Sequence, residues 1–277
     1  MRFAKAHGLG NDFILVAEEE APKDLSPWTV RLCDRHRGIG GDGVVLHRRA
    51  PDGVSFRLVN ADGLAGEISG NGVRCLAALA VRNGWAPARH VVTTVVGRKE
   101  VEVSATSPTL YRVVTDLGPP GLGSADVPVA LDPPALRVID HALEAGGRTV
   151  RVTATSMGNP HCAVFLDVPA DDPLLRSLGP TLEFHPFFPR RTNVEFVTVV
   201  SPSEIRVRFW ERGVGYTMAS GTGAASAVVA SILTGRTGRR VRAECDGGTL
   251  EVEWPEGGSV RQTGDVEILY EGDWLVR

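Results

Sequence analysis

Two apolar stretches of the chain begin with the same polar phrase. Ser69-Gly70-Asn71-Gly72 precedes a run rich in Ala, Val and Leu, and Ser220-Gly221-Thr222-Gly223 precedes a similar run after an offset of 151 residues (220 minus 69). A small hydroxyl residue before a series of helix formers is typical of a helix N-cap. The pattern therefore predicts two helices, capped by Ser69 and Ser220. Each is apolar on nearly every side and is expected to be buried.

Each predicted helix start is also a candidate anion site. The N–H groups of the first helical turn have no partner within the helix, and the helix dipole is positive at this end. Glycines let a ligand approach the backbone closely. Two such sites of the same form suggest that one carboxylate is held between two halves of the protein.

The remaining pattern is mainly one of strands and glycine turns. Alternating or continuous apolar residues predict strands, and clusters of Gly, Asn and Asp predict the turns between them. A short helix is predicted over residues 26–36, with Ser26 as its cap and Pro27 at its first position. The strands are expected at residues 3–4, 13–16, 44–46, 54–59, 91–96, 101–103, 111–115 and 266–270, with 97–98 as a hairpin turn.

The same order of motifs occurs twice. Residues 10–13 resemble 158–161 at an offset of 148, residues 56–59 resemble 205–209 at 150, and residues 97–102 resemble 248–253 at 151. Matches at nearly one offset predict a duplicated unit, each copy a mixed or antiparallel, barrel-like sheet around one central helix in an α+β fold. The Pro- and Gly-rich stretch at 118–123 is the best boundary. We therefore expect domains at 1–118 and 119–264, with 265–277 returning to the first.

Composition restricts the class of protein further. The chain has 277 residues, of which 43% are hydrophobic and 23% charged, and its net charge is -3, as in an ordinary globular protein; this length favours two domains over one large domain. This charge gives no reason to expect nucleic acid or an anionic membrane as a partner. No signal peptide or membrane span is evident, so a cytoplasmic location is expected. The four cysteines lack metal or redox spacing, and we expect reduced, buried thiols and no metal site.

Two similar halves suit one type of reaction. A racemase or epimerase that works without a cofactor takes a proton from one face of a carbon and returns it to the other. It needs two opposed acid/base groups, a fixed carboxylate and a site closed to water. No lysine lies in a motif for pyridoxal phosphate, so a route without a cofactor is preferred.

Several longer motifs resemble the diaminopimelate epimerase family. They occur in the family's order and cover nearly the whole chain. They are residues 7–13 (HGLGNDF), 56–63 (FRLVNADG), 70–75 (GNGVRC), 156–162 (SMGNPHC), 191–193 (RTN) and 211–213 (ERG). The resemblance implies epimerisation of LL-diaminopimelate to meso-diaminopimelate, on the route to lysine and peptidoglycan, by a homodimer without a cofactor.

The resemblance also implies roles for individual residues. The proton-transfer positions correspond to Ser69 and Ser220, and His161 and Glu211 correspond to residues that assist them. Asn side chains offer both a donor and an acceptor, and an Arg offers a planar fork for a distal carboxylate. The implied substrate-binding residues are Asn11, Asn60, Gly70, Asn71, Asn159, Asn193, Glu211, Arg212, Gly221 and Thr222.

Three positions depart from the family pattern. The family has cysteine at both proton-transfer positions, where this chain has Ser69 and Ser220, and it often has glutamine at the position of Gly43. A serine hydroxyl is a far weaker acid than a thiol. Three explanations are open: activated natural serines, a deliberate replacement that traps an inactive form, or a retained binding site with altered chemistry. Cys75 is expected in the core of the first helix and does not replace the missing thiols.

Two other functions remain as alternatives. One is a racemase, isomerase or dehydratase of the same fold that acts on another amino acid or hydroxy acid. The other is a binding protein that keeps the amino-acid site without the thiols. Deuterium uptake at the α-carbon separates the catalysts from the binder.

Overall fold

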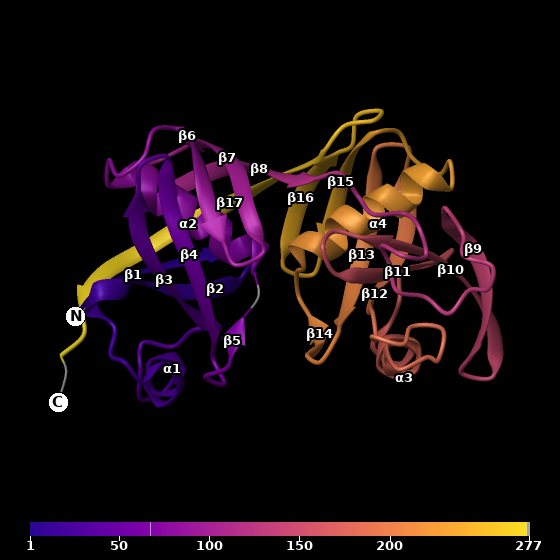
Figure 1. Cartoon of the computed structure of the whole chain (residues 1–277), viewed down its shortest axis with the longest axis horizontal. Helices are drawn as coiled ribbons and strands as arrows, with labels where there is room; N and C mark the ends of the chain where they lie inside the picture. The colour runs from indigo at the N-terminus through magenta and orange to yellow at the C-terminus, as the bar shows by residue number, and fades with distance from the viewer. Residues whose placement is uncertain (67, 276–277) are drawn as a thin grey trace. The chain divides into compact units, whose positions relative to one another are not determined.

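The computed structural model describes residues 1–66 and 68–275, which form two compact units. The first unit comprises Met1–Asp116 and Thr263–Arg277, and the second comprises Leu117–Gln262. Each unit encloses its own apolar core. Figure 1 labels the helices and strands of both units.

The first unit contains the helices α1 and α2 and the strands β1 to β8. Its elements are β1 (Arg2–Gly8), β2 (Asn11–Ala17), the 3-10 helix η1 (Glu18–Glu20), α1 (Leu25–Cys33), β3 (Gly43–Ala50), β4 (Gly53–Asn60), β5 (Ala65–Gly66), α2 (Gly70–Arg82), β6 (Arg89–Thr94), β7 (Gly97–Ala105) and β8 (Leu110–Gly118).

The second unit follows the same plan. Its elements are β9 (Val138–Ala145), β10 (Arg148–Ser156), β11 (Pro160–Phe165), α3 (Asp172–Glu183), β12 (Asn193–Ser201), β13 (Glu204–Glu211), β14 (Gly215–Thr217), α4 (Gly221–Leu233), β15 (Arg240–Cys245) and β16 (Gly248–Glu253). The last strand, β17 (Val260–Asp273), begins in the second unit and belongs from Thr263 onward to the first unit, where it pairs antiparallel with β1.

The strand pairings of the two units match one another. In the first unit β2 pairs parallel with β3, β3 antiparallel with β4, β4 parallel with β6, and β6 antiparallel with β7. In the second unit the same sequence of parallel and antiparallel pairs joins β11, β12, β13, β15 and β16. The predicted α+β fold with two pseudo-symmetric halves and mixed sheets is therefore confirmed.

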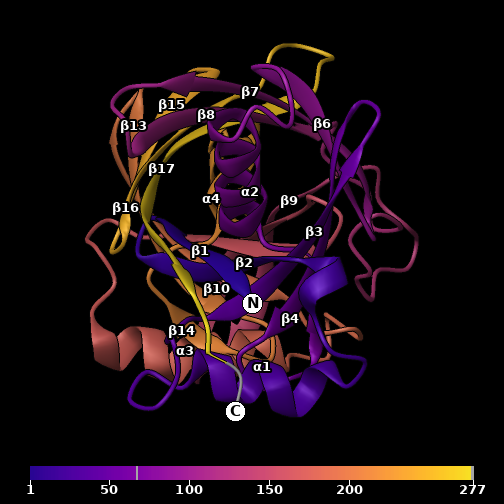
Figure 2. The same cartoon turned by 90° about the vertical axis from the view of Figure 1, so that its left-hand side faces the viewer.

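A buried helix fills the centre of each sheet. Every residue of α2 from Asn71 to Ala80 is buried, and the helix contacts β1, β2, β3, β4 and β7. Figure 2 shows the strands of the first unit curving around α2. In the second unit α4 is buried in the same way and contacts strands β10 to β13, β15 and β16. Because these helices are apolar on nearly all sides, burial within a curved sheet satisfies each face.

Each central helix begins directly against an aromatic ring. A Cβ atom built on Gly72 lies 3.2 Å from a ring carbon of Phe56 in β4, and one built on Gly223 lies 2.9 Å from a ring carbon of Phe209 in β13. Glycine at these two positions permits the close approach of helix and strand. The N-terminal turn of each helix is thereby fixed against the sheet.

The outer helices correct the sequence prediction. Helix α1 begins at Leu25 after Asp24 and ends at Cys33, so Ser26 is not its cap and the helix is shorter than 26–36. Helix α3 was not predicted, and Asp171 caps it by accepting a hydrogen bond from Leu174 N–H at 2.8 Å. Pro180 and Gly179 within α3 weaken its helical pattern, and packing of Gly179 on the sheet compensates.

Two further predictions, on a hairpin turn and on the cysteines, can be compared with the structure. The hairpin between β6 and β7 turns at residues 95–96, and Gly97 belongs to β7, so the predicted turn at 97–98 is two residues late. All four cysteines are buried and none forms a disulfide. Within residues 1–66 and 68–275, no helix is long and apolar enough to cross a membrane, and no cluster of His, Cys, Asp and Glu has the arrangement of a metal site.

Candidate active site

The two predicted N-caps are present and have nearly the same backbone geometry. Ser69 has φ/ψ of -128°/120° and its Oγ accepts the N–H of Gly72 at 3.1 Å. Ser220 has φ/ψ of -132°/122° and its Oγ accepts the N–H of Gly223 at 3.3 Å. The side chain therefore satisfies one N–H of each first turn, and the N–H groups before it remain directed out of the helix end. Such a helix end favours a carboxylate.

In the first unit, Asn11 and Asn71 contact each other. Asn71 Nδ2 donates to Asn11 Oδ1 at 3.2 Å, and Asn11 Nδ2 donates to Asp42 Oδ2 at 2.6 Å. Arg74, which is fully buried, donates to Asn71 Oδ1. The loop before β3 and the start of α2 thus orient two of the predicted binding amides from both sides.

A network of charged side chains holds Asp42, the residue that accepts a hydrogen bond from Asn11. Asp12 accepts Lys5 Nζ at 2.6 Å and both terminal nitrogens of Arg35 at 3.1 and 2.7 Å, and Arg35 also reaches Asp42 at 2.8 Å. Burial alone would raise the pKa of Asp12, but the hydrogen bonds from Arg35 and Lys5 outweigh burial and hold that pKa well below its usual value. Asp42 is consequently fixed by Arg35 where it accepts from Asn11.

Asn60 occupies a separate place in the first unit. It is the last residue of β4, is half-buried, and lies opposite Gly43 in the register of β3 and β4. Its backbone N–H donates to the Leu64 carbonyl at 2.9 Å, and its side chain has no hydrogen bond among the described residues. A Cβ on Gly43 would lie 2.8 Å from the Val59 carbonyl oxygen, so this backbone does not accept a longer residue at 43 without a shift.

In the second unit, Glu211 lies beside the cap of α4. It ends β13, and its Oε1 accepts the Thr217 hydroxyl at 2.5 Å while its carboxylate also hydrogen-bonds Ser220. Burial raises the pKa of Glu211, and the hydrogen bonds from Thr217 and Ser220 and the nearby His161 reduce that rise. Because Ser220 Oγ accepts from Gly223, its own proton is available to donate to Glu211. Ser220 is 6% exposed, whereas Ser69 is half-buried.

His161 lies on the neighbouring strand and is held at both ring nitrogens. Nδ1 is 2.6 Å from Oε1 of Glu195, and Nε2 is 2.9 Å from Oδ1 of Asn159. The side chains of His161 and Glu195 are each 1% exposed. The structure therefore brings His161, Asn159 and Glu211 to one end of β11 and β13, together with a buried carboxylate that sequence reasoning missed.

Asn193 and Arg212 are connected through the backbone. Asn193 Oδ1 accepts the N–H of Arg212 at 2.9 Å, and its Nδ2 donates to the Pro160 carbonyl at 2.8 Å. The Arg212 guanidinium donates to the carbonyl of Arg190 at 3.3 Å. Asn193 thereby fixes the backbone that carries Arg212 and Glu211. Gly221 and Thr222 lie in the first turn of α4, as predicted from the cap.

Cys75 and Cys162 are not placed to act as bases. Burial raises the pKa of the Cys75 thiol to about 12, and burial also raises the pKa of Cys162 well above its usual value. Both side chains are fully buried. The structure thus agrees with the prediction that Cys75 is a core residue.

Two supporting residues were missed, and each had a weak signal. Glu195 is a single acid within the apolar strand from Val194 to Val199, where a charge is costly unless it has a partner. Asp42 lies in a glycine-rich loop before a strand, a common position for binding groups. Their partners, His161 and Asn11, lie 34 and 31 residues away in the sequence, so no local pattern reveals the contacts.

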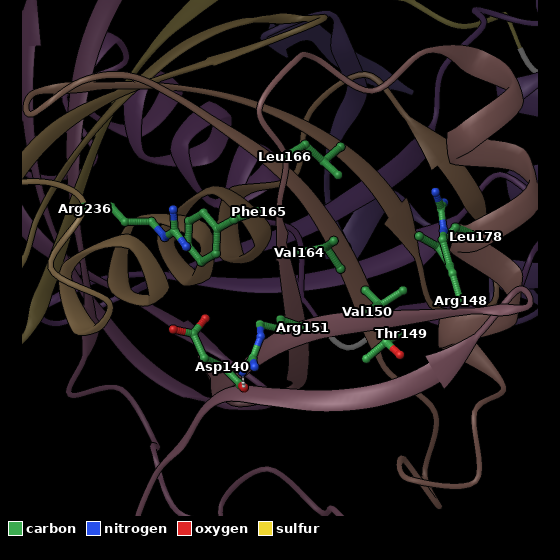
Figure 3. Close-up of a pocket in the computed structure, with 10 residues that line it drawn as sticks. All are labelled: Asp140, Arg148, Thr149, Val150, Arg151, Val164, Phe165, Leu166, Leu178 and Arg236. Atoms are coloured by element: carbon green, nitrogen blue, oxygen red, sulfur yellow. Dashed lines mark hydrogen bonds between the residues drawn. The ribbon is translucent and has the colours of Figure 1, made fainter.

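A separate pocket of about 360 Å³ lies in the second unit and contains none of the predicted site residues. Figure 3 shows its arginine side chains around an apolar floor, with the Arg236 guanidinium against the ring of Phe165. Arg151 donates to the Asp140 carbonyl at 2.9 Å.

Comparisons with known proteins agree with the motifs and geometry. The sequence profile of the diaminopimelate epimerase family matches residues 3–122 and 153–269. The diaminopimelate epimerase of Pelotomaculum thermopropionicum is 45% identical over 282 aligned positions, which cover 100% of both chains. That of Synechococcus elongatus is 42% identical and covers 98% of this chain and 97% of the relative.

Solved structures show the same fold at low sequence identity. A protein from Pseudomonas aeruginosa described as a predicted epimerase has a TM-score of 0.71 at 14% identity, covering 100% of this chain and 99% of that chain. A hydroxyproline epimerase from Agrobacterium vitis has a TM-score of 0.69 at 15% identity, covering 98% and 91%. Identity of 40 to 45% across the full length, together with the family profile, shows that this chain belongs to the diaminopimelate epimerase family.

Proposed function

We propose that this chain interconverts LL-diaminopimelate and meso-diaminopimelate by proton transfer at one α-carbon, without a cofactor. The observation that carries the proposal is the family relationship over the whole chain, combined with two helix ends of the same geometry, each capped by a residue at a proton-transfer position. The reaction is an isomerisation by an enzyme of this family.

The proposed binding roles follow from the chemistry of the side chains. The first-turn amides of α2 at Gly70 and Asn71 and of α4 at Gly221 and Thr222 bind the carboxylate next to the reacting carbon. There they also stabilise the negative charge that develops when the α-proton leaves. The remaining polar groups of the substrate are bound by Asn11, Asn60, Asn159, Asn193, Glu211 and Arg212.

The second unit has the groups for a proton relay. As the α-carbon proton passes to Ser220 Oγ, the hydroxyl proton of Ser220 passes to the carboxylate of Glu211, so no free alkoxide is formed. The raised pKa of Glu211, caused first by burial, makes this carboxylate a stronger base than an exposed one. On the other face, Ser69 gives its hydroxyl proton to the carbon while it takes one from water, and the hydroxide left behind is neutralised by the proton that Glu211 then releases, so both groups return to their starting states. The half-buried position of Ser69 is consistent with this exchange.

The serines have an energetic consequence. A thiol has a pKa near 8.5, and each pKa unit between donor and acceptor corresponds to about 1.36 kcal/mol. A direct serine alkoxide would therefore slow the reaction by several powers of ten, and the relay through Glu211 avoids only part of this cost. We expect a slow native enzyme whose rate rises strongly in the Ser69→Cys/Ser220→Cys variant.

A second candidate function is a protein that binds the amino acid without reaction. The specific observation in its favour is the replacement of both thiols by serine while the caps, binding amides and supporting network are retained. This function predicts saturable binding of diaminopimelate with no exchange of the α-proton.

Incubation with LL-diaminopimelate in heavy water tests the two functions. The epimerase incorporates one deuterium at the inverted α-carbon, detected by mass spectrometry together with chiral chromatography of the product. Ser220→Ala serves as the blank for the same preparation. If neither the native chain nor the double cysteine variant incorporates deuterium while both bind the substrate, the epimerase proposal is wrong and the binding protein is supported.

We further propose that the enzyme acts on a small amino acid in the cytoplasm as a homodimer, with no nucleic acid or membrane as partner. Domains at 1–118 with 265–277, and at 119–264, are proposed as the two halves. Light scattering after gel filtration tests the dimer, and limited proteolysis near residue 118 tests the domain boundary.

A further inference from the structure

Glu195 is a buried carboxylate without an assigned role, and its only side-chain partner among the described residues is His161. It lies on β12 beside β11 on one side and opposite Phe209 of β13 on the other. Its Oε1 is 2.6 Å from His161 Nδ1, the Cys162 backbone hydrogen-bonds the carboxylate, and its Oε2 has no partner among the described residues. A buried carboxylate lowers the stability of the fold unless a partner pairs with it and forms a hydrogen bond to it.

We propose that Glu195 is a positioning residue for proton transfer, which holds the His161 ring with Nε2 toward Asn159 and shares with Nδ1 the second proton of the ring. This inference rests on the proposed epimerase function, because Asn159 and Glu211 are the substrate-side groups of the cluster. It assigns to Glu195 the orientation and charge of His161, and it assigns no contact between Glu195 and substrate.

The hydrogen bonds of the His161 ring fix where its protons lie. An amide oxygen only accepts, so Nε2 of His161 carries a proton where it meets Asn159 Oδ1. The remaining proton lies between Nδ1 and Oε1 of Glu195. Whether it resides on the ring or on the carboxyl, the net charge of the pair is zero. The pair can therefore change the charge on the ring without exchanging a proton with water.

The neighbouring charges make this property useful for catalysis. Glu211 on β13 interacts electrostatically with both His161 and Glu195, and Ser220 and Thr217 hydrogen-bond Glu211. When Glu211 is ionised, its charge attracts the proton toward His161. When Glu211 has accepted a proton through Ser220, that attraction is lost and the proton can return toward Glu195. Burial raises the pKa of Glu195 and His161 opposes the rise, which brings the two proton positions closer in energy.

A double-mutant cycle tests whether Glu195 acts through His161. Glu195→Gln keeps the size of the side chain and removes its charge. We expect kcat for epimerisation to fall about 10- to 100-fold, as for other residues that orient a functional histidine, with KM changed less than about threefold. In a His161→Asn background, Glu195→Gln should cause no further loss, because the group it positions is absent.

Glu183 is the matched control for loss of a buried carboxylate. It is 3% exposed, lies in the same unit, and accepts Trp210 Nε1 at 2.8 Å and the Gly213 N–H at 2.9 Å, with no hydrogen bond to a histidine. The effects of Glu183→Gln and His161→Asn should multiply, whereas those of Glu195→Gln and His161→Asn should not. If the effects of Glu195→Gln and His161→Asn on kcat also multiply, and Glu195→Gln lowers thermal stability as much as Glu183→Gln does, then Glu195 has a purely structural role and the inference is overturned.

A measurement that needs no activity separates this inference from the proposed function. Proton and ¹⁵N NMR of histidine-labelled chain should show a far-downfield Nδ1–H resonance in the native chain that is lost in Glu195→Gln and in His161→Asn. In Glu195→Gln the group facing Nδ1 is a neutral amide, so the short charge-assisted hydrogen bond that gives this resonance is absent. An unchanged Nδ1 resonance overturns the role of Glu195 even in an active enzyme. Absence of epimerisation in the native and double cysteine chains, with the expected NMR change, overturns only the function.

Discussion

Gly223→Ala perturbs the point where α4 meets β13. The added Cβ would lie 2.9 and 3.0 Å from two ring carbons of Phe209 and 3.0 Å from Cβ of Ser220. The Phe209 ring is 1% exposed and packed on all sides, so it cannot rotate away. To reach an ordinary contact of 3.4 Å, helix and ring must separate by about 0.5 Å (3.4 minus 2.9).

The equivalent Gly72→Ala provides the matched control. Its Cβ would lie 3.2 and 3.3 Å from the Phe56 ring and 3.4 Å from Cβ of Ser69, which is tight but requires little movement. Overpacking costs about 1–3 kcal/mol, and alanine stabilises a helix by up to about 1 kcal/mol over glycine. We therefore expect Gly223→Ala to lose about 1–2 kcal/mol and Gly72→Ala to stay within about 0.5 kcal/mol of the native chain.

Urea denaturation followed by circular dichroism measures these differences, and hydrogen exchange locates them at the start of α4. The shift of the α4 amides should also reduce epimerisation about tenfold, since misplacement by about 1 Å can cost about 10²-fold. The reasoning is refuted if Gly223→Ala is as stable as the native chain, or if Gly72→Ala is destabilised equally.

Three further predictions concern the charged and capping residues. Ser220→Ala should lower stability by about 1 kcal/mol through loss of the cap and reduce deuterium incorporation at least about 10²-fold, measured by denaturation and mass spectrometry. Burial raises the pKa of Glu211, so the free energy of unfolding falls as pH rises above the unfolded pKa of 4.5. Glu211→Gln should therefore raise the melting temperature at pH 7 but not below pH 4. An equal gain at both pH values would contradict a destabilising charge on Glu211. Burial would raise the pKa of Asp12, but Arg35 and Lys5 lower it, so the ionised carboxylate stabilises the native chain above pH 3.8 and this stabilisation is lost as pH falls. Asp12→Asn should therefore lower the free energy of unfolding by about 3 kcal/mol at pH 7, measured by urea denaturation, and by much less near pH 2.

The central helices and their caps could be predicted from sequence because the signals are local. A serine followed by glycines and a run of small apolar residues specifies both the start of the helix and its burial, and the second copy of the phrase indicates the repeated fold. The contacts within the first turn, from Ser69 to Gly72 and from Ser220 to Gly223, span only three residues. Local hydrogen bonds of this kind are encoded by residue type and spacing.

The outer helices show where local signals were insufficient. Asp24 precedes α1 without making a side-chain cap, so the position of this helix depends on Leu32 and Cys33 packing in the core. Helix α3 contains Gly179, which is weak in an isolated helix but necessary here because the Trp210 ring lies against it. Packing against the sheet decided both helices.

The sequence alone determined that the chain is a repeat, that two capped helices lie at its centre, and that the family's two cysteines are serines. Only the tertiary structure decided that Glu195 holds His161, that Asp42 holds Asn11, and that β17 pairs with β1. The physical reason is the range of the interactions. Caps and periodicity act over a few residues, whereas buried ion pairs and strand pairing join residues that become neighbours only when the chain has folded.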